Sequence, residues 1–148
     1  MDHKTALQQA VSEIFENMAF QELEIVSGNP LPAVVLCSFR QATMTIYSPI
    51  QGTLVITISP SMMRTVAANV LGIDPDDVDS SMESDVVAEM LNTMAGAWMR
   101  KITEVSQPYE LGLPDTADAD YIDSKAAEIH CVFSADDDFI EVSFFLID

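Results

Sequence analysis

The sequence predicts an α+β fold in which a helix-plus-strands unit occurs twice. Two long segments place apolar residues at the period of a helix, and several others alternate apolar and polar residues as half-buried strands do. The two helical segments are also similar to each other in sequence, and each precedes predicted strands. We therefore expect one domain over residues 1–148, with pseudo-repeat halves at about 5–72 and 80–148.

The composition is that of a folded, strongly acidic domain. Hydrophobic residues make up 49% of the chain and charged residues 20%, which argues against disorder. With 24 acidic and 6 basic side chains the net charge is −18, so nucleic acid and anionic lipid are repelled and a basic partner surface is favoured. No segment reaches the roughly 20 apolar residues of a membrane span. We expect a cytoplasmic protein that binds neither nucleic acid nor membrane.

The first unit begins with a helix and continues in strands. Thr5 and Gln8 form a capping box, from which an apolar row extends to about Glu24. The row consists of Leu7, Val11, Ile14, Phe15 and Met18. Residues 27–33 contain a glycine and two prolines and break the helix. Strands are then expected at 33–40, 42–48 and 53–59, with a turn at 48–52 joining the last two.

A short helix and an acidic turn complete the first unit. Ser59 as N-cap and Pro60 in the first turn begin the helix, and Gly72 ends it. Residues 73–81, IDPDDVDSS, carry several aspartates, but they lack the glycine and the terminal glutamate of an EF-hand calcium loop. A solvated turn is the better interpretation.

The second unit begins with the longest predicted helix. Ser80 and Glu83 supply its capping box, and it is expected to end near Val105. Its core face consists of Val87, Leu91, Met94 and Trp98, flanked by Met90, Ala95 and Ile102. A linker at 108–120 leads to strands near Tyr121, at 126–134 and at 139–147, with Asp136, Asp137 and Asp138 as the turn between the last two.

The last strand and the cysteines carry further expectations. One face of the last strand is apolar and the other is partly apolar, which predicts a central strand or one covered by a partner. His130 has no second ligand nearby in the sequence and is interpreted as structural. Cys37 and Cys131 are interpreted as two buried, reduced thiols, with a disulfide or a metal site less favoured.

A second row of residues lies almost opposite the core face of the long helix. It consists of Asp85, Glu89, Asn92 and Gly96, at spacings of four, three and four, so its polar members point away from the core. A solvated helix face is the simplest interpretation of such a row. Gly96 favours a function, because an interior helical glycine costs about 1 kcal/mol relative to alanine and its bare backbone would let a partner approach closely.

This row resembles the signature of the bacterial chemotaxis phosphatases that include CheX, CheC and FliY. The family signature is Asp or Ser, then Glu, then Asn on a long helix, with a proline about twenty residues downstream. Here those residues are Asp85, Glu89, Asn92 and Pro114. The segments QAVSEIFENMAF and PIQGTLVITISPSMMRTVAANVLG are also similar to the corresponding family segments, so the resemblance covers most of the chain. It implies long helices packed on an antiparallel sheet.

The resemblance also implies a substrate and a role for each residue of the signature. The substrate would be the phosphoaspartate of a CheY-like response-regulator receiver domain. Asn92 would orient the attacking water, and Glu89 would pair with the active-site lysine of the receiver. Asp85 would adjust docking or the start of the helix, Gly96 would allow close approach, and Pro114 would shape the neighbouring loop. Mg²⁺ would be bound by the receiver, and this chain would bind no cofactor or metal.

Two further implications concern the number of sites and the assembly. Superposing Glu13 on Glu89, an offset of 89 − 13 = 76, places Glu16 where Asn92 stands in the second copy. Only the second copy therefore carries the full signature, which is similar to CheX, with one site per chain. CheX relatives pair as homodimers, so a homodimer is expected.

Other functions stay open at this point. The chain could be a non-catalytic receiver-binding or flagellar-switch-associated dimerisation module, although such a module need not retain both Glu89 and Asn92. It could also be a structural dimerisation domain with a solvated acidic helix. No Ser-His-Asp or Cys-His arrangement and no phosphate-binding glycine loop is present, and nothing specific favours a two-carboxylate hydrolase that uses Glu13 or Glu89.

Overall fold

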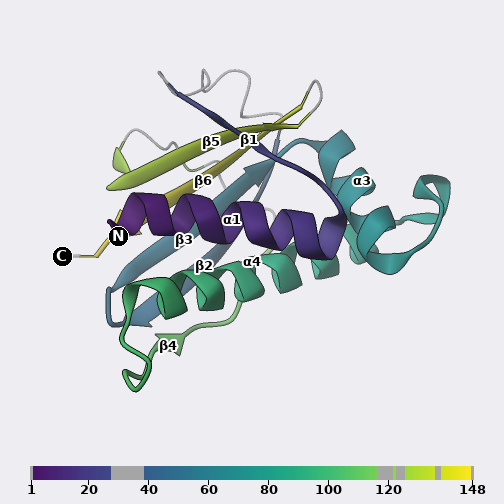
Figure 1. Ribbon diagram of the computed structural model, residues 1–148. Coiled ribbons are helices and arrows are strands. Elements are labelled where there is room, and N and C mark those ends of the chain that lie inside the picture. Colours follow the sequence, from purple (N-terminus) through teal and green to yellow (C-terminus); the bar gives the residue numbers. More distant parts are fainter. Residues whose placement is uncertain (1, 28–38, 117–121, 123–125, 136–137, 148) are drawn as a thin grey trace.

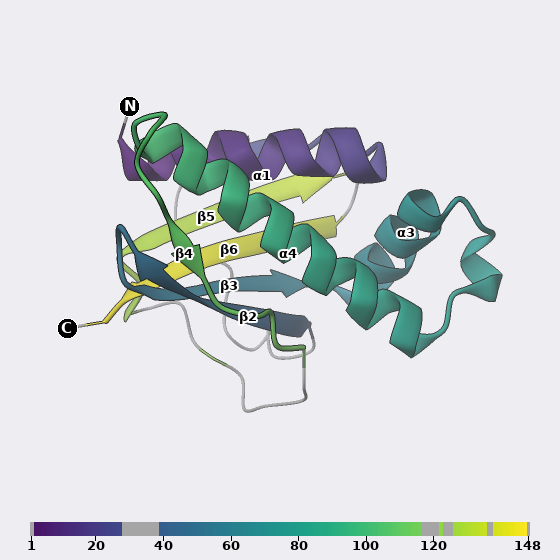
Figure 2. The same ribbon diagram turned by 90° about the horizontal axis from the view of Figure 1, so that it is seen from below.

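Two long helices lie side by side across one face of an antiparallel sheet, and a shorter helix lies at one end of them (Figures 1 and 2). The computed structural model describes residues 2–27, 39–116, 122, 126–135 and 138–147. In chain order the elements are α1 (His3–Ala19), β1 (Glu24–Val26), β2 (Arg40–Ser48), β3 (Gly52–Ile58), α3 (Pro60–Leu71), the 3₁₀ turn η1 (Pro75–Asp77), α4 (Ser80–Ile102), β4 (Glu110–Leu111), β5 (Ile129–Ala135) and β6 (Asp138–Leu146).

The strand order confirms the predicted pseudo-symmetric repeat. The sheet runs β1-β5-β6-β3-β2-β4, and every strand pair in it is antiparallel. If β1, β2 and β3 of the first half are exchanged with β4, β5 and β6 of the second, the same order results, read backwards. A pseudo-twofold axis therefore passes between β3 and β6, which pair from Gly52↔Leu146 to Ile58↔Ile140.

The final strand is central in the sheet, which is one of the two positions predicted for it. β6 lies between β5 and β3. On the helix side it contributes Ile140, Val142 and Phe144 to the core, and all three are buried. Its other face carries Glu141 and Ser143, which are also buried. Residues 140–144 of the strand are thus buried on both faces, whereas Leu146 at its end is 50% exposed.

The core between the helices and the sheet is centred on Trp98. Its ring meets Phe144 of β6 edge-on, with centroids 5.1 Å apart, and both side chains are fully buried. The indole N–H donates to the backbone oxygen of His3 at 3.0 Å. Trp98 of α4 therefore joins the sheet to the start of α1 through packing and a hydrogen bond. The predicted core faces of both long helices are confirmed.

His130 contacts a buried carboxylate on the sheet face away from the helices. Its Nε2 lies 3.3 Å from Oε2 of Glu141, whose side chain is 2% exposed. The distance suits an ion pair when the imidazole is protonated, but the angles are not those of a hydrogen bond, and neither atom has a hydrogen-bond partner among the described residues. Oε1 of the same glutamate accepts from Ser143 Oγ at 3.3 Å. The expected structural role of His130 agrees with this placement.

The N-terminal caps of both long helices differ from the sequence prediction. Asp2, not Thr5, caps α1, and its carboxylate accepts from the Thr5 backbone N–H. Asp79, not Ser80, caps α4 and accepts from the Met82 N–H. The aspartate stands three residues before the predicted cap in α1 and one residue before it in α4, and aspartate suits an N-cap as well as serine or threonine does. Glu83 is buried in the first turn of α4.

The C-terminal ends of the long helices also differ from the prediction, whereas α3 agrees with it. α1 ends at Ala19, not near Glu24, because Phe20 adopts φ 53° and turns the chain toward β1. α4 ends at Ile102, not near Val105. α3 begins after Ser59, whose side chain accepts from the Met62 N–H, and ends at Gly72 with φ 67°, as the sequence indicates.

The strands agree with the prediction in the second hairpin and differ from it at the edges. β5 and β6 pair up to Ala135↔Asp138, as the predicted hairpin requires. Part of the predicted turn lies outside the described residues, and so do most of the predicted strand at 33–40 and the predicted strand near Tyr121. The predicted linker at 108–120 contains β4. Beyond β4, Asp115 exchanges two backbone hydrogen bonds with Thr43 of β2.

Gly52 occupies a position where only glycine fits. A Cβ built there would lie 2.5 Å from Cζ of Phe144 and would also overlap the carbonyl oxygen of Phe145. We expect Gly52→Ala to lower the free energy of unfolding by about 3 kcal/mol, the upper end of typical overpacking costs, measured by urea denaturation. Gln51→Ala, at an exposed neighbour, should change it by less than about 0.5 kcal/mol. Equal stability of the two variants would contradict the packing described for β3.

Candidate active site on helix α4

Three of the predicted site residues lie exposed in one row on α4. Asp85, Glu89 and Asn92 are exposed, whereas Val87 and Leu91 on the other side of the helix are buried. No hydrogen bond or ion pair joins the side chains of the three to any described residue. The backbone oxygen of Glu89 accepts from Thr93 Oγ1 at 2.9 Å, as part of the helix. An acid and a carboxamide one turn apart are therefore free to engage a partner.

Gly96 belongs to the row in position but is not exposed. A Cβ built at Gly96 would lie 3.3 Å from Nη1 of Arg100 and 3.8 Å from Oη of Tyr109, the nearest side-chain atoms of the described residues. Arg100 Nη1 donates to Tyr109 Oη at 3.2 Å. In this structure the bare backbone of Gly96 accommodates two side chains of its own chain, which sequence spacing alone does not indicate.

Pro114 lies in the segment that returns beside α4. After α4 the chain turns and runs back as β4 between the helix and the β2 edge (Figure 2). Tyr109 lies beside Gly96. Pro114 is half-buried and directly precedes Asp115, whose backbone pairs with Thr43 of β2.

The matching face of α1 is different, because its glutamate is already paired. Glu13, which superposes on Glu89 in the repeat, accepts from Nζ of Lys101 at 2.9 Å. Glu16 stands exposed where α4 has Asn92. The sequence predicts the missing amide of the first copy, but it does not predict the Lys101 ion pair, because the two residues are far apart in the chain. At the two superposed positions, α4 has Glu89 and Asn92 without partners among the described residues, whereas α1 has a paired acid and a second acid.

The thiol of Cys131 is unsuited to act as a nucleophile. Burial raises its pKa to about 11, an effect only partly opposed by the positive charge of Lys4, so it is protonated near neutral pH. The expectation of a buried, reduced thiol is confirmed for Cys131, whereas Cys37 lies outside the described residues. Within the part of the chain that the structure describes, no three His, Cys, Asp or Glu side chains gather as metal ligands would.

The fold and the row on α4 define a class of protein: a pseudo-symmetric α+β domain that presents a glutamate and an asparagine on its second long helix. Residues 40–134 match the family described as "Chemotaxis phosphatase CheX". Because the match covers more than half of the 148 residues, the chain belongs to the CheX family. A comparison with curated protein sequences gave no match.

Solved structures of CheX proteins have the same fold. The chemotaxis protein CheX from Vibrio vulnificus superposes with a TM-score of 0.75 at 18% identity, over 97% of each chain. CheX from Borrelia burgdorferi, in a complex described as CheX-CheY-BeF3-Mg+2, superposes with a TM-score of 0.72 at 17% identity, over 99% of each chain. FliY from Thermotoga maritima superposes with a TM-score of 0.62 at 10% identity, over 93% of this chain and 83% of the FliY chain. At these identities the likeness concerns the fold.

None of the helices in the described part of the chain has the length and apolar character needed to cross a membrane.

Proposed function

We propose that this chain is a phosphatase that hydrolyses the phosphoaspartate of a CheY-like receiver domain. The observation that carries the proposal is the pair Glu89 and Asn92, which are exposed on a long helix of a CheX-family chain and whose side chains have no partner among the described residues. The Borrelia burgdorferi neighbour supports the choice of partner, since that CheX is in a complex with CheY, BeF3 and Mg²⁺.

Asn92 would act by orienting water. Its side-chain carbonyl can accept a hydrogen bond from a water molecule, while its NH₂ group can donate to a neighbouring oxygen. Hydrolysis of an acyl phosphate depends mostly on the alignment of the attacking water and on charge neutralisation. Mg²⁺ held by the receiver would supply the charge neutralisation. Water would attack phosphorus directly, so phosphate would leave without a covalent intermediate on this chain.

Glu89 would anchor the helix in the receiver through a lysine of its active site. It lies one helical turn before Asn92, about 60° round the helix axis, so both side chains can enter one cleft. The Glu13–Lys101 contact of 2.9 Å shows the same pairing within the chain, at the position that superposes on Glu89. Asp85 would adjust docking, and Pro114 would shape the loop beside the cleft.

The direct test is the decay of a phosphorylated receiver domain from the same genome, with Mg²⁺ present, with and without this protein. With the receiver in tenfold excess, the proposal requires faster loss of phosphate and more than one turnover per chain. Binding to the receiver without faster decay would instead favour the non-catalytic receiver-binding module. Neither binding nor decay, across all receivers of that genome, would leave the solvated-helix interpretation.

A homodimer remains part of the proposal, with a sheet edge as its support. Because β6 is central, its apolar faces need no partner. β1, however, is a three-residue edge strand that pairs only with residues 132–134 of β5, from Val26↔Val132 to Glu24↔Ser134. The edge before Val132 has no partner strand among the described residues and could pair with another chain. We expect light scattering at high micromolar concentration to give twice the chain mass, and a strict monomer would contradict it.

A further inference from the structure

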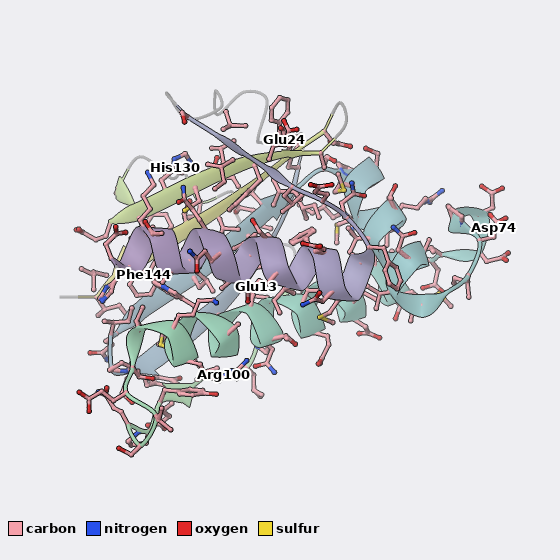
Figure 3. All side chains as sticks on the ribbon, in the orientation of Figure 1. Glu13, Glu24, Asp74, Arg100, His130 and Phe144 are labelled. Atoms are coloured by element: carbon pink, nitrogen blue, oxygen red, sulfur yellow. The ribbon has the colours of Figure 1, made fainter. Side chains whose placement is uncertain are left out.

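Arg100 extends the row on α4 beyond the residues of the proposed active site. It follows Gly96 by four residues and Asn92 by eight. Asp85, Glu89, Asn92, Gly96 and Arg100 all fall within an arc of about 80° on the helix. Figure 3 shows Arg100 near the end of α4, on its β4 side. The exposed face that begins with two acids therefore ends with a base.

Two neighbours hold the guanidinium group over this face. Long side chains on a helix lean toward its N-terminus, and Gly96 has no side chain to oppose this. Nη1 of Arg100 accordingly lies 3.3 Å from the place of a Gly96 Cβ and donates to Tyr109 Oη at 3.2 Å. The cation is thus oriented toward Asn92 before any partner binds, which lowers the entropy lost on binding.

The charge of Arg100 has no counterion in the described chain. Its one side-chain hydrogen bond is to the neutral hydroxyl of Tyr109, although a guanidinium has five N–H donors. The next residue, Lys101, is paired with Glu13. The chain has 24 acidic and 6 basic side chains, yet this oriented arginine pairs with none of the acids that the structure describes. It is available to an acid on another molecule.

We propose that Arg100 is a docking residue, which forms an ion pair with an acidic side chain of the receiver beside the phosphorylation site. The proposal rests on the proposed function above. The docking face would then be negative at Asp85 and Glu89 and positive at Arg100, so that only one direction of α4 in the receiver cleft matches the charges. Complementary charges of this kind set specificity and association rate.

Arg100 acts on docking and leaves the chemical step unchanged. It is two turns of helix from Asn92, about 12 Å along the axis, and the side chain of Asn92 leans away from it toward the helix N-terminus. The guanidinium reaches only the turn of Gly96. A contact with the phosphoryl group is therefore out of its reach, and its loss should appear in KM rather than in kcat.

The test compares Arg100→Ala with Lys101→Ala, which makes the same change in net charge at the next residue. With a phosphorylated receiver, Arg100→Ala should raise KM about five- to tenfold, reduce the salt dependence of KM and leave kcat within about twofold. Lys101→Ala should leave KM unchanged, because its ammonium is paired on the α1 side. Equal effects of the two variants on KM, or a loss of kcat in Arg100→Ala, would overturn the proposal.

Binding to a receiver trapped with beryllofluoride and Mg²⁺ separates this proposal from the proposed function. If the wild type binds but does not speed decay, the proposed function fails, and a five- to tenfold weaker affinity of Arg100→Ala would still support the docking role. If the wild type is active and both variants bind as it does, only the docking role fails. If the wild type neither binds nor acts, both fail together.

Gly96→Ala distinguishes a docking effect from damage to the fold. Alanine is the better helix former, so the melting temperature should not fall. The added methyl group would meet Nη1 of Arg100 at 3.3 Å and displace the guanidinium. A rise in KM, smaller than that of Arg100→Ala, with an unchanged or higher melting temperature supports the proposal, whereas an unchanged KM contradicts the role given to Gly96.

Discussion

Asn92→Ala should lower the rate of receiver dephosphorylation by about 100-fold or more, the typical cost of removing one group that aligns or stabilises the reacting atoms. The side chain is exposed and has no hydrogen bond to any described residue, so the free energy of unfolding should change by less than about 0.5 kcal/mol. Loss of activity with full stability is the result that separates a catalytic amide from a solvated one. Initial rates at saturating phosphorylated receiver measure it.

The repeat provides a matched control for this variant. Glu16 occupies on α1 the position that Asn92 occupies on α4, and it is likewise exposed. Glu16→Ala should leave the rate unchanged, because the matching acid Glu13 is tied to Lys101 at 2.9 Å. The account would be wrong if both variants, or neither, lost activity while remaining folded.

Trp98→Ala should lower the free energy of unfolding by about 3–5 kcal/mol, as is usual for a buried aromatic residue. The side chain is fully buried, it packs edge-on against Phe144 at 5.1 Å, and its N–H donates to the backbone of His3. The substitution leaves a cavity at the centre of the core and removes the hydrogen bond from the indole to that carbonyl. A domain is usually stable by only about 5–15 kcal/mol, so this is a large fraction of the total.

Trp98→Phe serves as the companion variant in urea denaturation. It keeps an aromatic ring against Phe144 but removes the N–H that reaches His3. It should therefore cost less than Trp98→Ala, and it should cost at least the 0.5–1.5 kcal/mol typical of one hydrogen bond. A cost below about 1 kcal/mol for Trp98→Ala would show that the core is not organised around this residue.

Much of the fold is predictable from the sequence because its strongest signals are local or periodic. The apolar rows of α1 and α4 recur at the helical period and become the buried faces. Ser59 and Gly72 bound α3 as expected, since capping depends on residues close in the chain. The internal repeat predicts the two-unit architecture, and the strand order reproduces it.

Features that depend on distant contacts could not be predicted. β1 and β4 are only three and two residues long and are strands because β5 and β2 pair with them, which no local pattern indicates. The early end of α1 depends on the left-handed turn at Phe20, a conformation rare for a bulky side chain.

In the candidate site, too, local spacing is predictable from the sequence and contacts between distant residues are not. The spacing of Asp85, Glu89 and Asn92 places them on one exposed face, as predicted from helical geometry. The cover over Gly96 could not be predicted in this way, because Tyr109 lies thirteen residues further along the chain (109 − 96) and reaches α4 only after the turn into β4.

We expect Asp85, Glu89 and Asn92 of α4 to enter the phosphorylation site of a receiver. The most direct measurement is NMR titration of the isotope-labelled protein with a beryllofluoride-activated receiver and Mg²⁺. The account predicts that the amide signals that shift most belong to residues 85–100 and 109–115, with few changes on α1. Shifts centred instead on β1 and β5, or no shifts at all, would contradict it.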